Sequence, residues 1–166
     1  DGYICDNTKF GIDLTDEDAI TFLSDTIGKT YTSYISEDEN RKIRYRLILS
    51  DASQVEALKR YNIVQRKSKI LSGFELLNEE EVYLPYLIRG IIDGDGCIYA
   101  TSYGKRAFFI VTASKKFADW LTYILSHRFY MKDIHPYQTA NGILRIDTAL
   151  EYNIRILKDI ISDQPY

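Results

Sequence analysis

The feature that most limits how this chain can fold is a repeated order of elements. The tetrapeptide DGYI at residues 1–4 returns as DGCI at residues 95–98. After each copy, the spacing of apolar residues predicts strand, strand, helix, strand, strand, helix. A repeat of this length is that of a small domain rather than of a solenoid. The sequence therefore predicts two structural units with the same plan.

Two helices are expected in the first unit, each after a residue that can cap its first turn. Asp16 or Thr15 begins one helix, which ends at Gly28. Asp51 or Ser53 begins the other. Four apolar residues of the first helix are expected to turn inward: Ala19, Ile20, Phe22 and Leu23. The expected strands lie within residues 3–7, 9–15, 30–36 and 41–49, with a charged turn at 37–40.

The second unit has an additional helix in front of its strands. Pro85 suits the first turn of a helix, and Gly96 is a stop signal. No such helix precedes the first unit, so we expect residues before Asp1 to be absent from this sequence. The repeats predict a first unit at residues 1–67, a linker at 68–83 and a second unit at 84–166.

Two acids stand where this additional helix ends. Asp93 and Asp95 lie at the end of the helix that carries negative partial charge, so the helix dipole opposes them. A divalent cation such as Mg²⁺, which prefers oxygen ligands, gives a reason for carboxylates there. Gly90 and Gly94 would allow a second helix to approach closely. The alternative is that DGDG is only a tight turn, since Asp and Gly are common turn residues.

These residues carry a family resemblance. IRGIIDGDG at residues 88–96 resembles the LAGLIDADG motif of homing endonucleases, and RYNIVQRKS at residues 60–68 resembles the segment that closes the first unit in that family. The resemblance covers nearly the whole chain. It implies an α+β fold of αββαββα units in pseudo-two-fold duplicate, with antiparallel saddle-shaped sheets and helices on one face.

The resemblance also implies a function, that of a monomeric, site-specific, Mg²⁺-dependent double-strand DNA endonuclease of the mobile-intron or intein type. Asp1 and Asp95 then correspond to the catalytic metal ligands. Lys67 corresponds to a basic residue near the active site, and its alternative is a solvated lysine after a helix. Asp16 corresponds to a peripheral site position or is a plain helix cap. Asp93, with Gly90 and Gly94, is expected at the helix interface.

A sheet that reads the DNA major groove needs one apolar face and one cationic or hydrogen-bonding face. Lys42, Arg44 and Arg46 alternate with apolar residues in this way, although a solvated strand edge has the same pattern. Residues 107–111, AFFIV, are apolar on both faces and do not fit it. The other residues expected to contact DNA are Lys9, Tyr99, Tyr103, Lys105, Arg106 and Arg145.

Composition weakens the endonuclease hypothesis. The formal charge is −3, which is unusual for a protein that holds a long duplex. The second unit has Ala113 where the first has Asp16, and it ends without an RKS segment. One alternative is a cleavage-inactive DNA- or RNA-binding protein of the same fold, an intron maturase or transcription regulator. The other is a truncated remnant that self-associates through residues 87–94.

Several other classes of protein are disfavoured. The two cysteines, Cys5 and Cys97, form no zinc-binding pattern and favour a reducing intracellular setting, whether cytoplasm, nucleoid or organelle matrix. His127 and His135 have no partner at metal-binding spacing. No apolar run reaches transmembrane length, so no membrane partner is expected.

Overall fold

The computed structural model describes residues 2–36 and 42–162, which belong to two compact units. One unit reaches to residue 66, and the other begins at residue 67. Asp1 and the expected turn at residues 37–40 lie outside the described residues.

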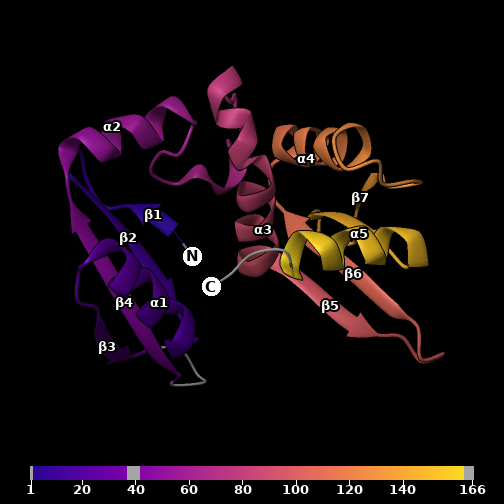
Figure 1. The fold of residues 1–166 in the computed structure, drawn as a ribbon, viewed down its shortest axis with the longest axis horizontal. Helices are drawn as coiled ribbons and strands as arrows, with labels where there is room; N and C mark the ends of the chain where they lie inside the picture. The colour runs from indigo at the N-terminus through magenta and orange to yellow at the C-terminus, as the bar shows by residue number, and fades with distance from the viewer. Residues whose placement is uncertain (1, 37–41, 163–166) are drawn as a thin grey trace. The chain divides into compact units, whose positions relative to one another are not determined.

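The first unit is a four-stranded antiparallel sheet with two helices, in the expected order (Figure 1). The strands lie in the order β1-β2-β4-β3. Asp16 and Asp51 are the N-caps of the helices, and Gly28 ends α1 with a left-handed backbone. The elements are β1 (Gly2–Ile4), β2 (Lys9–Leu14), α1 (Glu17–Ile27), β3 (Thr32–Ile35), β4 (Ile43–Ser50) and α2 (Ala52–Arg60).

The buried face of α1 is narrower than expected. Ile20 is fully buried, and Leu23 packs against the same core with Leu47 and Leu49 of β4. Ala19 and Phe22 are exposed, which corrects the expectation that both turn inward. Phe22 follows Ile20 by two positions, which is more than half a helical turn away.

The second unit repeats this plan after an additional helix. Its sheet has the order β5-β6-β8-β7, the same as in the first unit. Short 3-10 helices lie at Lys67–Lys69 and Asn78–Tyr83, before the first α-helix of this unit. The elements that follow are α3 (Leu84–Asp95), β5 (Gly96–Ala100), β6 (Arg106–Thr112), α4 (Lys115–His127), β7 (Pro136–Gln138), β8 (Leu144–Thr148) and α5 (Glu151–Ser162).

One face of the second sheet carries the larger core. The register pairs Ile110 with Ile146 and Phe108 with Thr148, so these side chains share a face. Residues of all three helices pack against this face, and each helix contributes at least one fully or almost fully buried side chain: Ile88, Leu121 and Leu157. The α+β fold class with helices on one face of each sheet is thereby confirmed.

Helix α3 ends abruptly, and this places the acids. Leu84, Ile88 and Ile92 form its buried stripe, four residues apart. At Gly96 the backbone becomes extended and enters β5 directly. A Cβ at Gly96 would lie 2.4 Å from the carbonyl oxygen of Ile92, so only glycine fits this exit.

The segment expected as a linker packs against the second unit. Leu71 and Phe74 lie against its core, and the hydroxyl of Ser114 donates a hydrogen bond to the carbonyl of Leu71. The rings of Phe74 and Trp120 meet edge to face, with centroids 5.2 Å apart. Gly73 lies under Trp120 with φ +99°. Residues 71–76 are therefore part of this unit's packing.

None of the helices in the described ranges is long and apolar enough to cross a membrane.

We predict that Gly73→Ala destabilises the second unit by about 2–4 kcal/mol, because the new Cβ would lie 2.2 Å from Trp120. The measurement is the midpoint of thermal or urea unfolding. Gly104→Ala is the matched control, since Gly104 also has positive φ but open space around it. It should cost about 1 kcal/mol. Equal losses in both variants would show that backbone conformation alone matters at Gly73.

Candidate functional site

Asp95 is the last residue of α3 and is exposed. No hydrogen bond to its carboxylate comes from the other described residues. The negative end of the helix dipole disfavours a carboxylate in this position. Asp95 is therefore a charge that its own helix does not compensate and that a cation or a cationic side chain can stabilise.

Lys67 is the cationic side chain that the second unit provides near Asp95. It is half-buried, and burial lowers the pKa of its ammonium group from the ordinary value of 10.5. The Asp95 carboxylate raises this pKa and so opposes part of the effect. The structure thus brings together two of the residues that the sequence pointed to.

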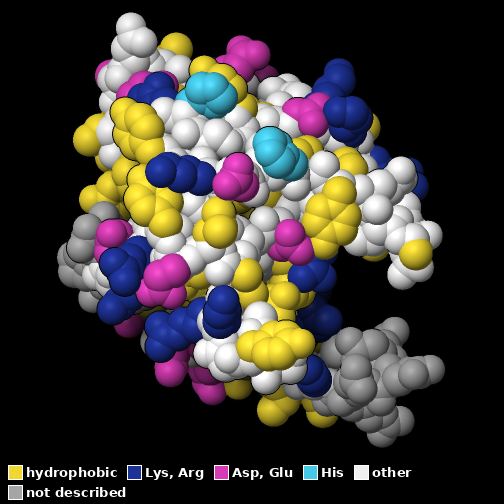
Figure 2. Space-filling model, turned by 90° about the vertical axis from the view of Figure 1, so that its right-hand side faces the viewer, with side chains coloured by type: hydrophobic (Ala, Val, Ile, Leu, Met, Phe, Trp, Pro, Cys, Tyr) yellow, Lys and Arg dark blue, Asp and Glu magenta, His cyan; other side chains and the backbone are white. Residues whose placement is uncertain are grey.

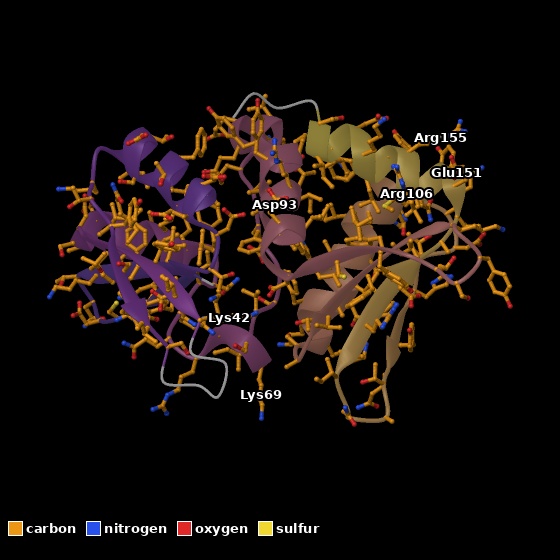
Figure 3. The ribbon with its side chains drawn as sticks, turned by 90° about the horizontal axis from the view of Figure 1, so that it is seen from below. Lys42, Lys69, Asp93, Arg106, Glu151 and Arg155 are labelled. Carbon is orange, nitrogen blue, oxygen red and sulfur yellow. The ribbon has the colours of Figure 1, made fainter. Side chains whose placement is uncertain are left out.

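Asp93 has a different environment. Its Oδ2 accepts a hydrogen bond from Nε of Arg89, one turn earlier in α3, at 3.3 Å. Arg89 is 7% exposed, so the carboxylate of Asp93 compensates a buried cation. Figure 3 shows Asp93 on α3. This arrangement suits a packing role better than metal binding.

The remaining residues of the expected centre are placed as follows. Asp16 caps α1, with Oδ1 accepting hydrogen bonds from the backbone nitrogens of Asp18 and Ala19. Gly90 and Gly94 lie at exposed positions of α3, and a Cβ at Gly90 would meet no atom within 4 Å. Asp1 lies outside the described residues. In the described ranges, no group of three or more His, Cys, Asp and Glu side chains is arranged for metal binding.

In the first sheet, the face opposite the helices holds an arginine in an ion-pair network. Arg46 donates from Nε and Nη2 to the two carboxylate oxygens of Asp13, at 2.8 and 2.9 Å. Nη2 also donates to the hydroxyl of Tyr34 at 3.1 Å. The ion pair with Arg46 is the main cause that lowers the pKa of Asp13. Arg46 is therefore largely engaged by its own sheet.

The second sheet has a related network on the same face. Arg145 donates from Nε to Oδ2 of Asp147 at 3.0 Å, and its guanidinium carbon lies 4.0 Å from the centre of the Phe109 ring. The hydroxyl of Tyr137 donates to the same Oδ2 at 2.7 Å. The ring of Tyr99 meets Phe109 edge to face. Phe109 is thus covered, whereas Val111 on the same face is exposed, so the apolar stretch 107–111 fits a polar sheet face only in part.

The other residues expected to contact DNA are dispersed within the two units. In the first unit, Lys9 and Lys42 are exposed, and Arg44 is half-buried on the face of Arg46. In the second, Tyr103 and Lys105 lie in the hairpin turn between β5 and β6.

Arg106 lies on the other face of the second sheet. The register pairs it with Ala100, next to the pair formed by Ile98 and Phe108, so it shares the face that the helices cover. Figure 3 shows Arg106 beside Glu151 and Arg155 of α5. We therefore leave Arg106 out of the sheet surface that could meet DNA.

The surface of the molecule has no field of one sign on the side drawn in Figure 2. Lys and Arg side chains alternate there with Asp and Glu, in keeping with the net charge of −3. His127 and His135 are both exposed, and the ring of His127 stacks on Tyr123 with centroids 4.3 Å apart. Neither histidine belongs to a metal-binding group among the described residues.

Sequence reasoning missed the acidic and aromatic partners of the two arginines. Arg145 and Asp147 are two positions apart on one strand, so alternation alone puts both on one face. Asp13 and Arg46 are partners across β2 and β4, and only the register reveals this pairing. Tyr34 and Tyr137 lie on the edge strands of their sheets, β3 and β7.

No protein-family model matches the chain, and no curated protein sequence does either. Solved structures do match. The N-terminal LAGLIDADG domain of DUF199/WhiA has a TM-score of 0.62 and is 12% identical, with 99% of this chain and 76% of that chain covered. The LAGLIDADG meganuclease I-AabMI, bound to uncleaved DNA, has a TM-score of 0.56 and is 14% identical, with 95% and 74% covered.

Full-length DUF199/WhiA from Thermatoga maritima has a TM-score of 0.58 and is 8% identical, with 97% of this chain covered. This chain covers 50% of that protein. At these identities the likeness concerns the fold alone. The described units therefore have the fold of LAGLIDADG domains, which occurs in homing endonucleases and in WhiA.

We predict that Lys67 titrates below the ordinary lysine range and that Asp95→Asn lowers its pKa further, since the carboxylate raises it. NMR titration of ¹³C-methylated lysines measures both, with Lys67→Met to assign the signal. At pH values between the pKa of Lys67 in the folded chain and its higher pKa in the unfolded chain, this lysine is protonated only in the unfolded chain. The free energy of unfolding should therefore rise with pH in that range. A pKa of Lys67 that rises in Asp95→Asn would contradict this arrangement.

Proposed function

We propose that this protein is a site-specific, double-strand DNA endonuclease that hydrolyses phosphodiesters with Mg²⁺. The observation that carries the proposal is the pair of Asp95 and Lys67 at the end of α3. An exposed carboxylate at a helix C-terminus and a half-buried lysine whose pKa is lowered by burial do little for stability. Perturbed groups of this kind are typical of functional sites.

Among the described residues, Asp95 is chemically suited to be one ligand of a hard divalent cation. Asp95 offers carboxylate oxygens that no described side chain uses, and oxygen is the ligand that Mg²⁺ prefers. One carboxylate is too few to hold the ion alone, so further oxygen ligands are needed, and the family resemblance implies Asp1 as one of them. Bound metal would activate water and neutralise charge on the leaving oxygen. Lys67 would stabilise negative charge on the phosphate, and Asp95 would keep this lysine protonated.

The proposed DNA partner rests on the fold and on the polar faces of the sheets. I-AabMI, which has this fold, was solved bound to uncleaved DNA. Here, the sheet faces opposite the helices carry Arg44 in one unit, and Tyr99 and Arg145 in the other. Side chains of this kind contact phosphates and base edges in the major groove.

A second candidate is a DNA- or RNA-binding protein of the same fold that does not cleave, such as an intron maturase or a transcription regulator. Two observations favour it. Arg46 and Arg145 are both paired with aspartates, and the net charge is −3. Each reduces nonspecific attraction to DNA, which a regulator tolerates better than a nuclease that must hold a long duplex.

We predict that the protein cleaves one sequence of a randomised duplex library in Mg²⁺ and that Asp95→Asn loses at least about 100-fold of this activity, as expected when a metal ligand is removed. Binding of the same duplex in Ca²⁺ should persist in the variant. Lys67→Met should retain binding and slow cleavage.

Asp159→Asn is the matched control, because Asp159 is an exposed acid on α5 that has no place in the proposed site. It should cleave like the unmodified protein. Specific binding without cleavage by the unmodified protein in any divalent metal would favour the second candidate. Full activity in Asp95→Asn would overturn the catalytic assignment.

A further inference from the structure

We propose that Arg145 reads a guanine in bound DNA and that Asp147 and Phe109 position it for this, whereas Arg46 in the first unit is a structural ion pair. The inference rests on the proposed binding of double-stranded DNA. It does not depend on cleavage, so it applies to the endonuclease and equally to a regulator that binds DNA without cleaving it.

Arg145 is held by the inner part of its side chain. Nε donates to Oδ2 of Asp147 at 3.0 Å, and the guanidinium carbon lies over the Phe109 ring, 4.0 Å from its centre. Neither terminal amino group, Nη1 or Nη2, donates a hydrogen bond to any residue within 2–36 or 42–162. The side chain is 26% exposed. The fork formed by Nη1 and Nη2 is therefore the part of Arg145 that remains available to a ligand.

The groups that hold Arg145 are themselves held. The hydroxyl of Tyr137 donates to the same oxygen of Asp147 that accepts from Arg145. The rings of Tyr99 and Phe109 meet edge to face with centroids 5.8 Å apart. Because these contacts fix the carboxylate and the ring, the arginine loses little further conformational entropy on binding.

A guanidinium fork matches guanine and rejects adenine. In the major groove, guanine presents two acceptors, O6 and N7, to which two parallel N–H groups can donate. Adenine replaces O6 with the N6 amino donor, which leaves one of the two N–H groups without a partner. A lysine at this position would supply the charge but not the planar fork.

Arg46 lacks this freedom. Its Nη2 already donates to Asp13 and Tyr34, and its guanidinium lies 4.4 Å from the centre of the Tyr34 ring. A base that sought two N–H groups from Arg46 would compete with this network. The same residue type on equivalent strands, β4 and β8, thus serves two purposes.

The test is a coupling measurement in Ca²⁺, where cleavage does not interfere. Duplexes are first selected from a randomised library with the unmodified protein, and the selection is repeated with Arg145→Ala and Arg46→Ala. We expect Arg145→Ala to lose the guanine preference at one position and to bind the selected duplex about 10–100-fold more weakly. Arg46→Ala should keep every base preference.

In the selected duplex, the guanine whose preference is lost in Arg145→Ala is then replaced with 7-deazaguanine, which lacks the N7 acceptor. This change should weaken binding by the unmodified protein several-fold and leave Arg145→Ala unaffected. Arg145→Lys retains the positive charge and should show the same loss of preference, which guards against misfolding of the alanine variant. Asp147→Asn should reduce the ratio of guanine to adenine binding more than it reduces total affinity, as expected of a positioning residue.

An equal loss on all sequences in Arg145→Ala would make Arg145 a phosphate contact and overturn the inference, with the proposed function intact. A base preference that vanishes in Arg46→Ala and persists in Arg145→Ala would also overturn it. If the unmodified protein showed no sequence preference at all, the proposed function itself would fail, and the inference with it.

Discussion

The second unit depends on one constraint, the burial of the α3 stripe against its sheet. Leu84, Ile88 and Ile92 occupy the core side of this helix, and Leu87 and Ile91 pack beside them against the same core. Gly96 then converts helix to strand with no intervening loop. The position of Asp95 is fixed, because it is the last helical residue before the backbone becomes extended at Gly96. The helix dipole disfavours a carboxylate at this position. The carboxylate stays there because the buried residues of α3 fix the helix, although Asp95 itself is not part of their packing.

Much of this architecture is predictable because it depends on local rules. Caps at Asp16 and Asp51, the proline early in α3, the glycine after it and the alternation in the strands identify nearly every element. The exposure of Phe22 was not predicted, because the sequence pattern does not show where the buried face of the helix ends and an apolar residue next to it is assigned to that face. Packing of residues 71–76 was not predicted either, because a short irregular segment has no periodicity to interpret.

The candidate site was predictable in part. The motif at the end of α3 pointed to Asp95, and the sequence that closes the first unit pointed to Lys67. Which arginine is engaged by its own sheet and which has a free fork depends on cross-strand register, and composition says nothing about register. Arg46 and Arg145 have the same alternation with apolar neighbours, but the pairing of β2 with β4 gives Arg46 a bidentate carboxylate. Arg106 illustrates the same limit, since its face follows from its pairing with Ala100.

The packing of residues 71–76 also bears on where the chain can be divided without separating Lys67 from Asp95. Lys67 lies at the beginning of the second unit, and the stretch that joins it to α3 is fastened by Trp120 and Ser114. Recombination that joined a foreign first unit at residue 66 would keep Lys67, this fastening and Asp95 together. A crossover at residue 84, where the repeat in the sequence begins, would separate them. A division of the chain that keeps these residues together therefore lies seventeen residues before the start of the repeat, counting from 67 to 84.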